Sequence, residues 1–201
     1  MEFKDRVRKS IIKGAYVYKD VFIDYEYLIY SSNFQNSPYY IISAAENNYP
    51  HLTGVNPLLP AQEFYTKCLN STLRETDFDF SSKYNNEKEV KGSVRRKIQM
   101  LPMLATLFTS DLQAEEDFSK GNIHCSLATT DNTLTLGFVS SMLLRPKTLL
   151  KKNQLNLKNA VDVTLILRRN RGSMKFDTIV QSDVQRFRNN YPDIVDIRQV
   201  L

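Results

Sequence analysis

The chain has 201 residues, and its 42% hydrophobic content excludes wholesale disorder and predicts one domain with a substantial core. The formal net charge of +5 fits an anionic partner, although many soluble proteins carry such a charge. Two cysteines and two histidines exclude a convincing zinc site. No stretch approaches the roughly 18 apolar residues of a membrane span.

The first residues and the cysteines predict where the protein works. Charged residues fall within positions 1–6, where a secretory signal would need an apolar core. Cys68 and Cys125 lie far apart and outside any CxxC spacing. We therefore expect a cytoplasmic protein in a reducing compartment, with no membrane association.

The amino-terminal part of the chain changes from helical to strand periodicity. Apolar residues at helical spacing predict an amphipathic helix over residues 5–18. Side chains then alternate over residues 21–30, which predicts a strand. A turn over residues 33–38 precedes a second predicted strand at 39–45. The two strands are expected to form a hairpin.

The middle of the chain is predicted to hold helices separated by polar segments. Pro60 marks the start of one helix, which carries an apolar stripe. Residues 81–92 are polar and charged and predict a mobile loop. Residues 94–108 have a helical pattern, with a kink or break expected at Pro102.

The remainder predicts β-structure and completes an α+β fold. The expected strands cover residues 123–127, 134–139, 161–168 and 174–180, with a further extended or turn segment at 142–150. Residues 169–173 form a basic hairpin tip, and a short helix and tail follow over 182–201. We therefore predict N-terminal helices packed on a mostly antiparallel β-sheet, in a single domain over residues 1–201. Its helical and hairpin half covers about 1–110, and its β-meander about 111–181.

Positive charge is concentrated in one segment. Between Leu143 and Phe176 there are nine lysines and arginines but one acid, Asp162. The nine cations are Arg145, Lys147, Lys151, Lys152, Lys158, Arg168, Arg169, Arg171 and Lys175. A one-sided basic surface is the usual electrostatic footprint of nucleic-acid binding. The segment therefore predicts contacts with a nucleic-acid backbone.

His51 is the strongest candidate for proton chemistry. It is expected just past a strand end, in a loop that the polar residues and proline of positions 47–50 create. A neutral imidazole near pH 7 can accept or donate a proton. The alternative is a structural histidine that caps a turn. The other histidine, His124, lies in an apolar stretch beside Cys125, where a packing role is expected.

Three short motifs resemble a known family. They are Tyr49-Pro50-His51-Leu52-Thr53-Gly54, Arg145-Pro146-Lys147-Thr148-Leu149-Leu150-Lys151 and Val163-Thr164-Leu165-Ile166-Leu167-Arg168-Arg169. In this order, with early helices and a late meander, they resemble the phage-associated branch of the barnase–EndoU–colicin–RelE-like nucleases. The fourth such phage group is the most similar. The resemblance covers about residues 20–180.

The resemblance implies RNA cleavage without a metal or cofactor. The ribose 2′-hydroxyl would attack the adjacent phosphate and leave a cyclic phosphate and a 5′-hydroxyl. This chemistry needs a base, an acid and cations around the phosphorane. The resemblance makes His51 the family's loop histidine, and Lys147 with Thr148 the pair that holds the scissile phosphate. The predicted catalytic residues are therefore His51, Lys147 and Thr148. The general acid stays open, because no second catalytic histidine is evident.

RNA is the expected partner. The predicted substrate-binding residues are Thr53, Arg145, Arg168, Arg169, Arg171 and Lys175. No metal ligands are predicted, since the adjacent acids of residues 115–117 point in different directions on any regular element. A nuclease of this kind would act as a toxin or in phage–host conflict, where a cognate antitoxin or inhibitor is a candidate partner.

Two other classes of function fit the same sequence. A non-catalytic module could bind RNA, DNA or an acidic protein through the same basic sheet, with His51 in a structural role. The missing second histidine favours this alternative. A nucleotide transferase is a third possibility, because a His-Thr loop can hold phosphate.

Overall fold

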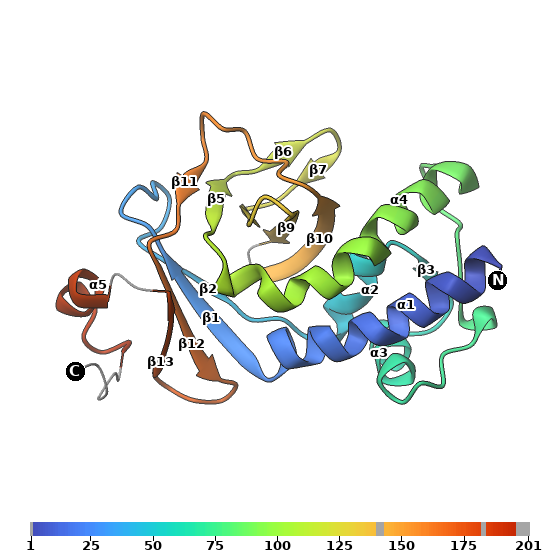
Figure 1. The fold of residues 1–201 in the computed structure, drawn as a ribbon, viewed down its shortest axis with the longest axis horizontal. Coiled ribbons are helices and arrows are strands. Elements are labelled where there is room, and N and C mark those ends of the chain that lie inside the picture. Colours follow the sequence, from blue (N-terminus) through green and yellow to red (C-terminus); the bar gives the residue numbers. More distant parts are fainter. Residues whose placement is uncertain (1, 140–142, 182–183, 196–201) are drawn as a thin grey trace.

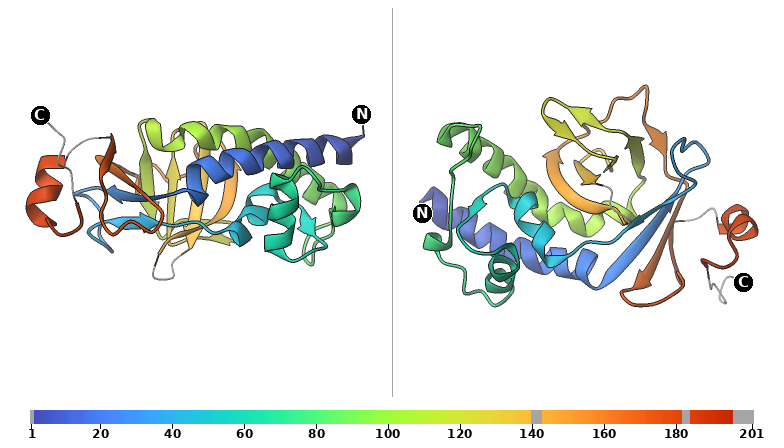
Figure 2. Two further views of the ribbon diagram at one scale, coloured as in Figure 1. Left: turned by 90° about the horizontal axis from the view of Figure 1, so that it is seen from below. Right: turned by 180° about the vertical axis from the view of Figure 1, so that it is seen from behind.

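The computed structural model describes residues 2–139, 143–181 and 184–195, and it confirms the α+β class (Figures 1 and 2). The helices are α1 (Phe3–Tyr18), α2 (Tyr49–Thr53), α3 (Ala61–Leu69), α4 (Glu87–Met100) and α5 (Val184–Asn190), with a π-helical turn η1 (Lys19–Ile23) and 3-10 helices η2 (Glu46–Asn48), η3 (Glu75–Asp77) and η4 (Leu101–Thr109). The strands are β1 (Tyr25–Tyr30), β2 (Tyr40–Ile42), β3 (Asn56–Pro57), β4 (Phe78–Asp79), β5 (Gln113–Glu116), β6 (Ser119–Lys120), β7 (Ile123–His124), β8 (Leu127–Thr130), β9 (Leu134–Val139), β10 (Arg145–Lys151), β11 (Val161–Asp162), β12 (Leu165–Asn170) and β13 (Thr178–Gln181). The helix expected to begin at Ser182 is α5, and Ser182 and Met142 lie outside the described residues.

The first predicted helix is confirmed as α1, but the strand after it starts late. Val7, Ile11 and Tyr18 recur at helical spacing, and all three are fully buried. Residues 19–23, part of which was expected as strand, continue the helix as a π-turn. The amide of Asp24 donates to the carbonyl of Lys19 at 3.2 Å, which is the i→i+5 pattern. β1 therefore begins only at Tyr25.

Two antiparallel sheets contain most of the strands. The four-stranded sheet has the order β13-β12-β1-β2, and the five-stranded sheet has the order β10-β9-β8-β5-β11. The predicted hairpin of β1 and β2 is confirmed, with Tyr27 opposite Ile42. Ile42 also bridges to Leu144, immediately before β10, so the two sheets meet at this point. Strands β8, β9 and β10 form the expected meander.

α4 begins within the segment that was expected to be a loop. Asn86 Oδ1 accepts a hydrogen bond from the Glu89 amide at 3.0 Å, and Glu89 Oε2 accepts one from the Asn86 amide at 3.1 Å. This reciprocal capping box starts the helix at Glu87. The break expected at Pro102 is present, because the chain changes from α4 to the 3-10 helix η4 after Met100.

A cluster of buried aromatic rings fixes the short helix α2 against its neighbours. Tyr18 of α1, Tyr49 of α2 and Tyr65 of α3 are fully buried. The centroid of the Tyr49 ring lies 5.1 Å from that of Tyr18 and 5.4 Å from that of Tyr65. The same core extends to the five-stranded sheet. Within the described residues, every helix is too short or too polar to cross a membrane.

Candidate active site

His51 projects from a single helical turn and not from a loop, which corrects the sequence prediction. Tyr49 and Leu52 point into the core and are fully buried, whereas His51 is exposed. The Tyr49 hydroxyl donates to the carbonyl of Ile11 at 2.5 Å and ties α2 to α1. The turn ends at Gly54, whose φ of 79° is left-handed. The imidazole therefore stands on a rigid, buried support.

Lys97 of α4 reaches the backbone of His51. Its ammonium group donates to the His51 carbonyl at 2.6 Å. A Cβ added at Gly54 would lie 2.8 Å from Cδ of Lys97, so the glycine leaves room for the lysine stem. Lys97 is half-buried, and desolvation of its charged form lowers its pKa to about 8. A lysine with this pKa can exchange a proton near neutral pH.

Lys147 of β10 is the second lysine whose charge acts on His51. It occupies a bulge between Pro146 and Thr148 in β10, where its side chain is exposed. Its ammonium group donates to the carbonyl of His124 at 3.1 Å. α2, α4 and β10 lie side by side, which accounts for the approach of three segments distant in sequence (Figure 2).

The charges of Lys97 and Lys147 both act on the imidazole of His51. Partial burial, followed by the positive charges of Lys97 and Lys147, holds the pKa of His51 below its usual value of 6.5. The imidazole is therefore neutral at pH 7 and available as a base, with two ammonium groups near it. We call His51, Lys97 and Lys147 the His51 cluster.

The two predicted threonines are not exposed at this cluster. Thr53 is fully buried, and its hydroxyl donates to the carbonyl of Pro50 at 2.7 Å, so it helps to close the α2 turn. Thr148 is 6% exposed and packs against Gly137, where an added Cβ would lie 2.9 Å from its methyl group. The structure thus brings together His51 and Lys147, whereas the side chains of Thr53 and Thr148 are buried.

The predicted basic residues of β12 have partners within the protein. Arg169 donates to Glu26 through Nε at 2.8 Å and through Nη2 at 2.7 Å. Arg171 donates to three carbonyls, those of Ile23 at 2.7 Å, Phe22 at 3.1 Å and Ala44. These contacts fasten the hairpin of β12 and β13 to β1 and η1.

The remaining predicted cations are placed differently. The guanidinium carbon of Arg168 lies 4.3 Å from the centroid of the Tyr25 ring. Arg145 is half-buried at the start of β10, and its charge acts on buried Tyr18. Lys175 is exposed at the hairpin. Contact of these residues with RNA stays a prediction.

Removing the Arg169 side chain should destabilise the fold. Desolvation raises the pKa of Glu26, but hydrogen bonds from Ser43 and Arg169 outweigh it, so the net pKa lies below its usual value. Arg169→Ala should lower the free energy of unfolding near pH 7 by about 1–3 kcal/mol, because it leaves a buried carboxylate without its charged partner. Urea unfolding would measure the change, which should shrink as the pH falls through the pKa of Glu26. Lys175→Ala is the exposed control, and an equal loss in both variants would contradict a structural role for the ion pair.

His124 differs from its predicted packing role. It is exposed, and its Nδ1 lies 3.1 Å from the hydroxyl oxygen of Ser119. Its carbonyl, and not its ring, accepts the bond from Lys147. Cys125 next to it is buried, and burial raises the pKa of its thiol. The ring of His124 therefore contacts Ser119, while its backbone contacts Lys147 of the His51 cluster.

Lys97 is the member of the cluster that sequence reasoning missed. It falls three residues after Val94 and four before Leu101, both fully buried, so it occupies a position on the apolar stripe of α4. A lysine on the buried face of a helix was the available signal. Within residues 2–139, 143–181 and 184–195, no group of three or more His, Cys, Asp or Glu side chains could hold a metal ion.

Comparison with known proteins gives one match. A family model described as phage-Barnase-EndoU-ColicinE5/D-RelE like nuclease 4 matches residues 10–185. No curated protein and no solved structure matches the chain. The matched range includes all of the His51 cluster and most of both sheets. The chain therefore belongs to the phage-associated barnase–EndoU–colicin E5/D–RelE-like nuclease family 4.

Proposed function

We propose that the protein is a metal-independent endoribonuclease whose catalytic residues are His51, Lys97 and Lys147. The observation that carries the proposal is the contact of the Lys97 ammonium group with the His51 carbonyl, and the charges of Lys97 and Lys147 both act on the neutral imidazole. Membership of a nuclease family supports it. A base and cations supplied by side chains suit attack by a ribose 2′-hydroxyl.

Each member of the cluster has one task in this reaction. His51 accepts the proton of the 2′-hydroxyl as its oxygen forms a bond to phosphorus. Lys147 stabilises the negative charge on the non-bridging oxygens of the phosphorane. Lys97 donates a proton to the 5′-oxygen as its bond to phosphorus breaks. The products are a 2′,3′-cyclic phosphate and a 5′-hydroxyl, and proton exchange with water restores both catalytic groups.

The pH dependence of cleavage follows from the two titrating groups. His51 accepts a proton only when neutral, so kcat/KM should rise with pH through its pKa, which lies below 6.5. Lys97 donates only when protonated, so kcat/KM should fall as the pH rises through about 8. Lys97→Arg should lower the maximum and remove the fall near pH 8, because a guanidinium stays charged. An alkaline limb that is identical in this variant would exclude Lys97 as the acid.

Purified protein incubated with total RNA in EDTA tests the activity. Fragmentation in EDTA, and none of single-stranded DNA, is the expected result, because DNA lacks the attacking hydroxyl. Tight, salt-sensitive RNA binding without cleavage would instead support the non-catalytic binding module. Activity that EDTA abolishes and magnesium restores would contradict the proposed mechanism.

The biological role that we propose is that of a toxin or an agent of phage–host conflict. The phage-associated family supports this role. An antitoxin or inhibitor would then act by covering the exposed side of the His51 cluster. Co-expression of such a partner should abolish cleavage without lowering the amount of nuclease.

A further inference from the structure

A polar cavity of about 690 Å³ adjoins the His51 cluster. Lys97 lines it, and the same residue contacts His51, so the cavity and the cluster share a wall. The other walls come from the segment after α2, from the loop before α4 and from α4 itself. The lining residues used below are Asn56, Ser81, Lys83, Tyr84, Glu89 and Arg96.

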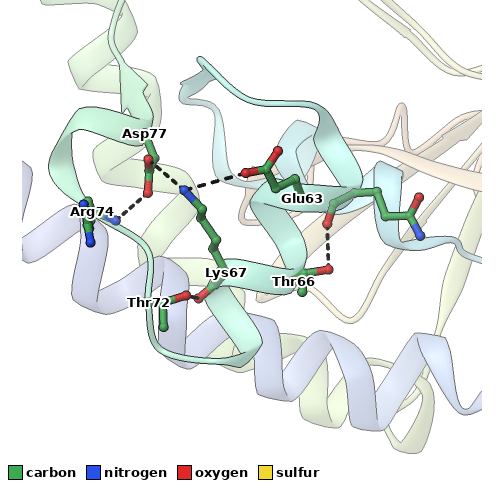
Figure 3. Close-up of polar contacts among 7 residues, drawn as sticks. Glu63, Thr66, Lys67, Thr72, Arg74 and Asp77 are labelled. Atoms are coloured by element: carbon green, nitrogen blue, oxygen red, sulfur yellow. Dashed lines mark hydrogen bonds and ion pairs between the residues drawn. The ribbon is translucent and has the colours of Figure 1, made fainter.

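The loop that forms the outer wall is held at both ends. Asn56 Nδ2 donates to Asp79 Oδ1 and to the Ser81 hydroxyl, both at 2.9 Å, which fixes the start of the loop to β3. The Asn86 capping box fixes its end to α4. Before the loop, Lys67 of α3 contacts Asp77 at 3.2 Å and braces the chain that enters β4 (Figure 3). Both ends of the loop are thus anchored, and the exposed residues between them include Lys83 and Tyr84.

The chemistry of the walls suits a nucleotide. Lys83, Arg96 and Lys97 give three positive charges against one acid, Glu89, which already accepts a hydrogen bond from the helix cap. Tyr84 lines this cavity and is 84% exposed, so its ring is accessible to a base. The ammonium group of Lys83 lies 5.6 Å from the centroid of its ring. An exposed ring beside cations is the arrangement that stacks a base and contacts its phosphate.

We propose that this cavity binds a nucleotide of single-stranded RNA next to the scissile bond, with Tyr84 stacking on the base and Arg96 contacting a phosphate. The proposal rests on the proposed function, since it takes RNA as the substrate of the His51 cluster. Stacking on a tyrosine tolerates any base, so the site would set the register of the strand without strong sequence preference. The amide group of Asn56 and the hydroxyl of Ser81 hold the loop, so the Asn56 side-chain oxygen and the Ser82 hydroxyl hydrogen are the groups that would bond the base edge or ribose.

A single introduced tryptophan can report on the site directly, because the chain has none. Tyr84→Trp in a His51→Ala background is titrated with short oligoadenylate while its fluorescence is followed. Leu157→Trp and Met174→Trp, at positions 77% and 89% exposed, are the controls for another loop and for the basic hairpin. Binding is measured independently by the anisotropy of labelled RNA. We expect the fluorescence of the Tyr84→Trp variant to be quenched with the same midpoint as the anisotropy change, and that of the Leu157→Trp variant to stay constant.

Two outcomes would overturn the proposal. One is unchanged fluorescence of the Tyr84→Trp variant at RNA concentrations that saturate the anisotropy, whether or not the Met174→Trp variant responds. The other is the absence of any RNA binding. If RNA quenches the Tyr84→Trp variant as expected but the wild-type protein cleaves nothing, the proposed function is contradicted and the binding site stands, so the two failures are distinguishable.

The RNA affinity of variants at Tyr84 and Arg96, and its dependence on salt, give a second test of the site. Tyr84→Ala should weaken RNA binding by about 5- to 100-fold, and Tyr84→Phe should retain it, because the ring and not the hydroxyl stacks. Arg96→Gln should reduce the slope of log affinity against log salt by about one. Lys88→Gln removes the same charge from an exposed position on α4 outside the cavity, and an equal loss of slope there would count against a specific phosphate contact.

Discussion

Replacing His51 with alanine is expected to lower the rate of RNA cleavage by about 10²- to 10⁴-fold, the usual contribution of a positioned general base. The side chain is exposed on α2, and the contacts that hold α2 come from Tyr49 and Thr53. Its removal should therefore leave the melting temperature and the RNA affinity close to those of the wild type. Single-turnover cleavage and thermal melting on the same samples measure both effects.

His124→Ala is the matched control for this experiment. It removes the other imidazole of the chain from an exposed position and leaves the carbonyl that Lys147 contacts. We expect cleavage within about threefold of the wild-type rate, a change well below the effect of a general base. Normal cleavage by His51→Ala would refute the catalytic assignment. Early melting of that variant would identify His51 as a structural residue.

Replacing Lys147 with alanine should lower cleavage by about 10²- to 10³-fold, the typical cost of one group that stabilises transition-state charge. The loss should appear in kcat more than in KM, because negative charge on the phosphorane is greatest in the transition state. Lys147→Arg should restore part of the activity, since it returns the charge at a different position.

Lys151→Ala is the control for charge alone. Lys151 lies four residues further along β10 and is exposed, with its ammonium group 3.2 Å from the side-chain oxygen of Gln99. Its removal lowers the net charge equally but leaves the His51 cluster intact. Equal losses of kcat in the two variants would mean that Lys147 acts only through the general field of the protein.

The class of fold was predictable because it depends on local periodicity. The spacing of Val7, Ile11 and Tyr18 predicted α1, and side-chain alternation in the sequence predicted β1 and β12, although burial in both strands forms a continuous run. The element boundaries that were wrongly predicted depend on hydrogen bonds to backbone amides, which leave no pattern of apolar residues in the sequence. The i→i+5 bond at Asp24 and the capping box at Asn86 are examples. Such bonds are decided by a few polar atoms, so hydrophobic patterning does not report them.

Part of the candidate site could also be predicted. His51 and Lys147 were each expected from short motifs, and the structure places them in one cluster. Lys97 was not expected, because its contact with His51 depends on how α4 packs beside α2. The burial of Thr53 follows from a helical turn where a loop was expected. Tertiary packing therefore explains why Lys97 was not predicted, and the unexpected helical turn explains why Thr53 is buried.

The basic segment shows why a count of charges along the sequence does not define a surface. Arg169 has no acidic neighbour nearby in sequence, but Glu26, 143 residues earlier, neutralises it across the sheet. The guanidinium group of Arg171 donates hydrogen bonds to the backbone carbonyls of Ile23 and Phe22 in η1. Strand pairing between β1 and β12 creates both sets of contacts, and no linear pattern reveals it.

The ends of the cleaved RNA test the central claim most directly. A labelled oligoribonucleotide is cut by the wild-type protein in EDTA, and the products are compared with those from the same strand carrying a single 2′-deoxy residue at the cut site. The account predicts a 2′,3′-cyclic phosphate and a 5′-hydroxyl from the first strand, and no cut at the substituted position of the second. A 5′-phosphate product, or equal cleavage at the 2′-deoxy position, would contradict attack by the ribose hydroxyl at the His51 cluster.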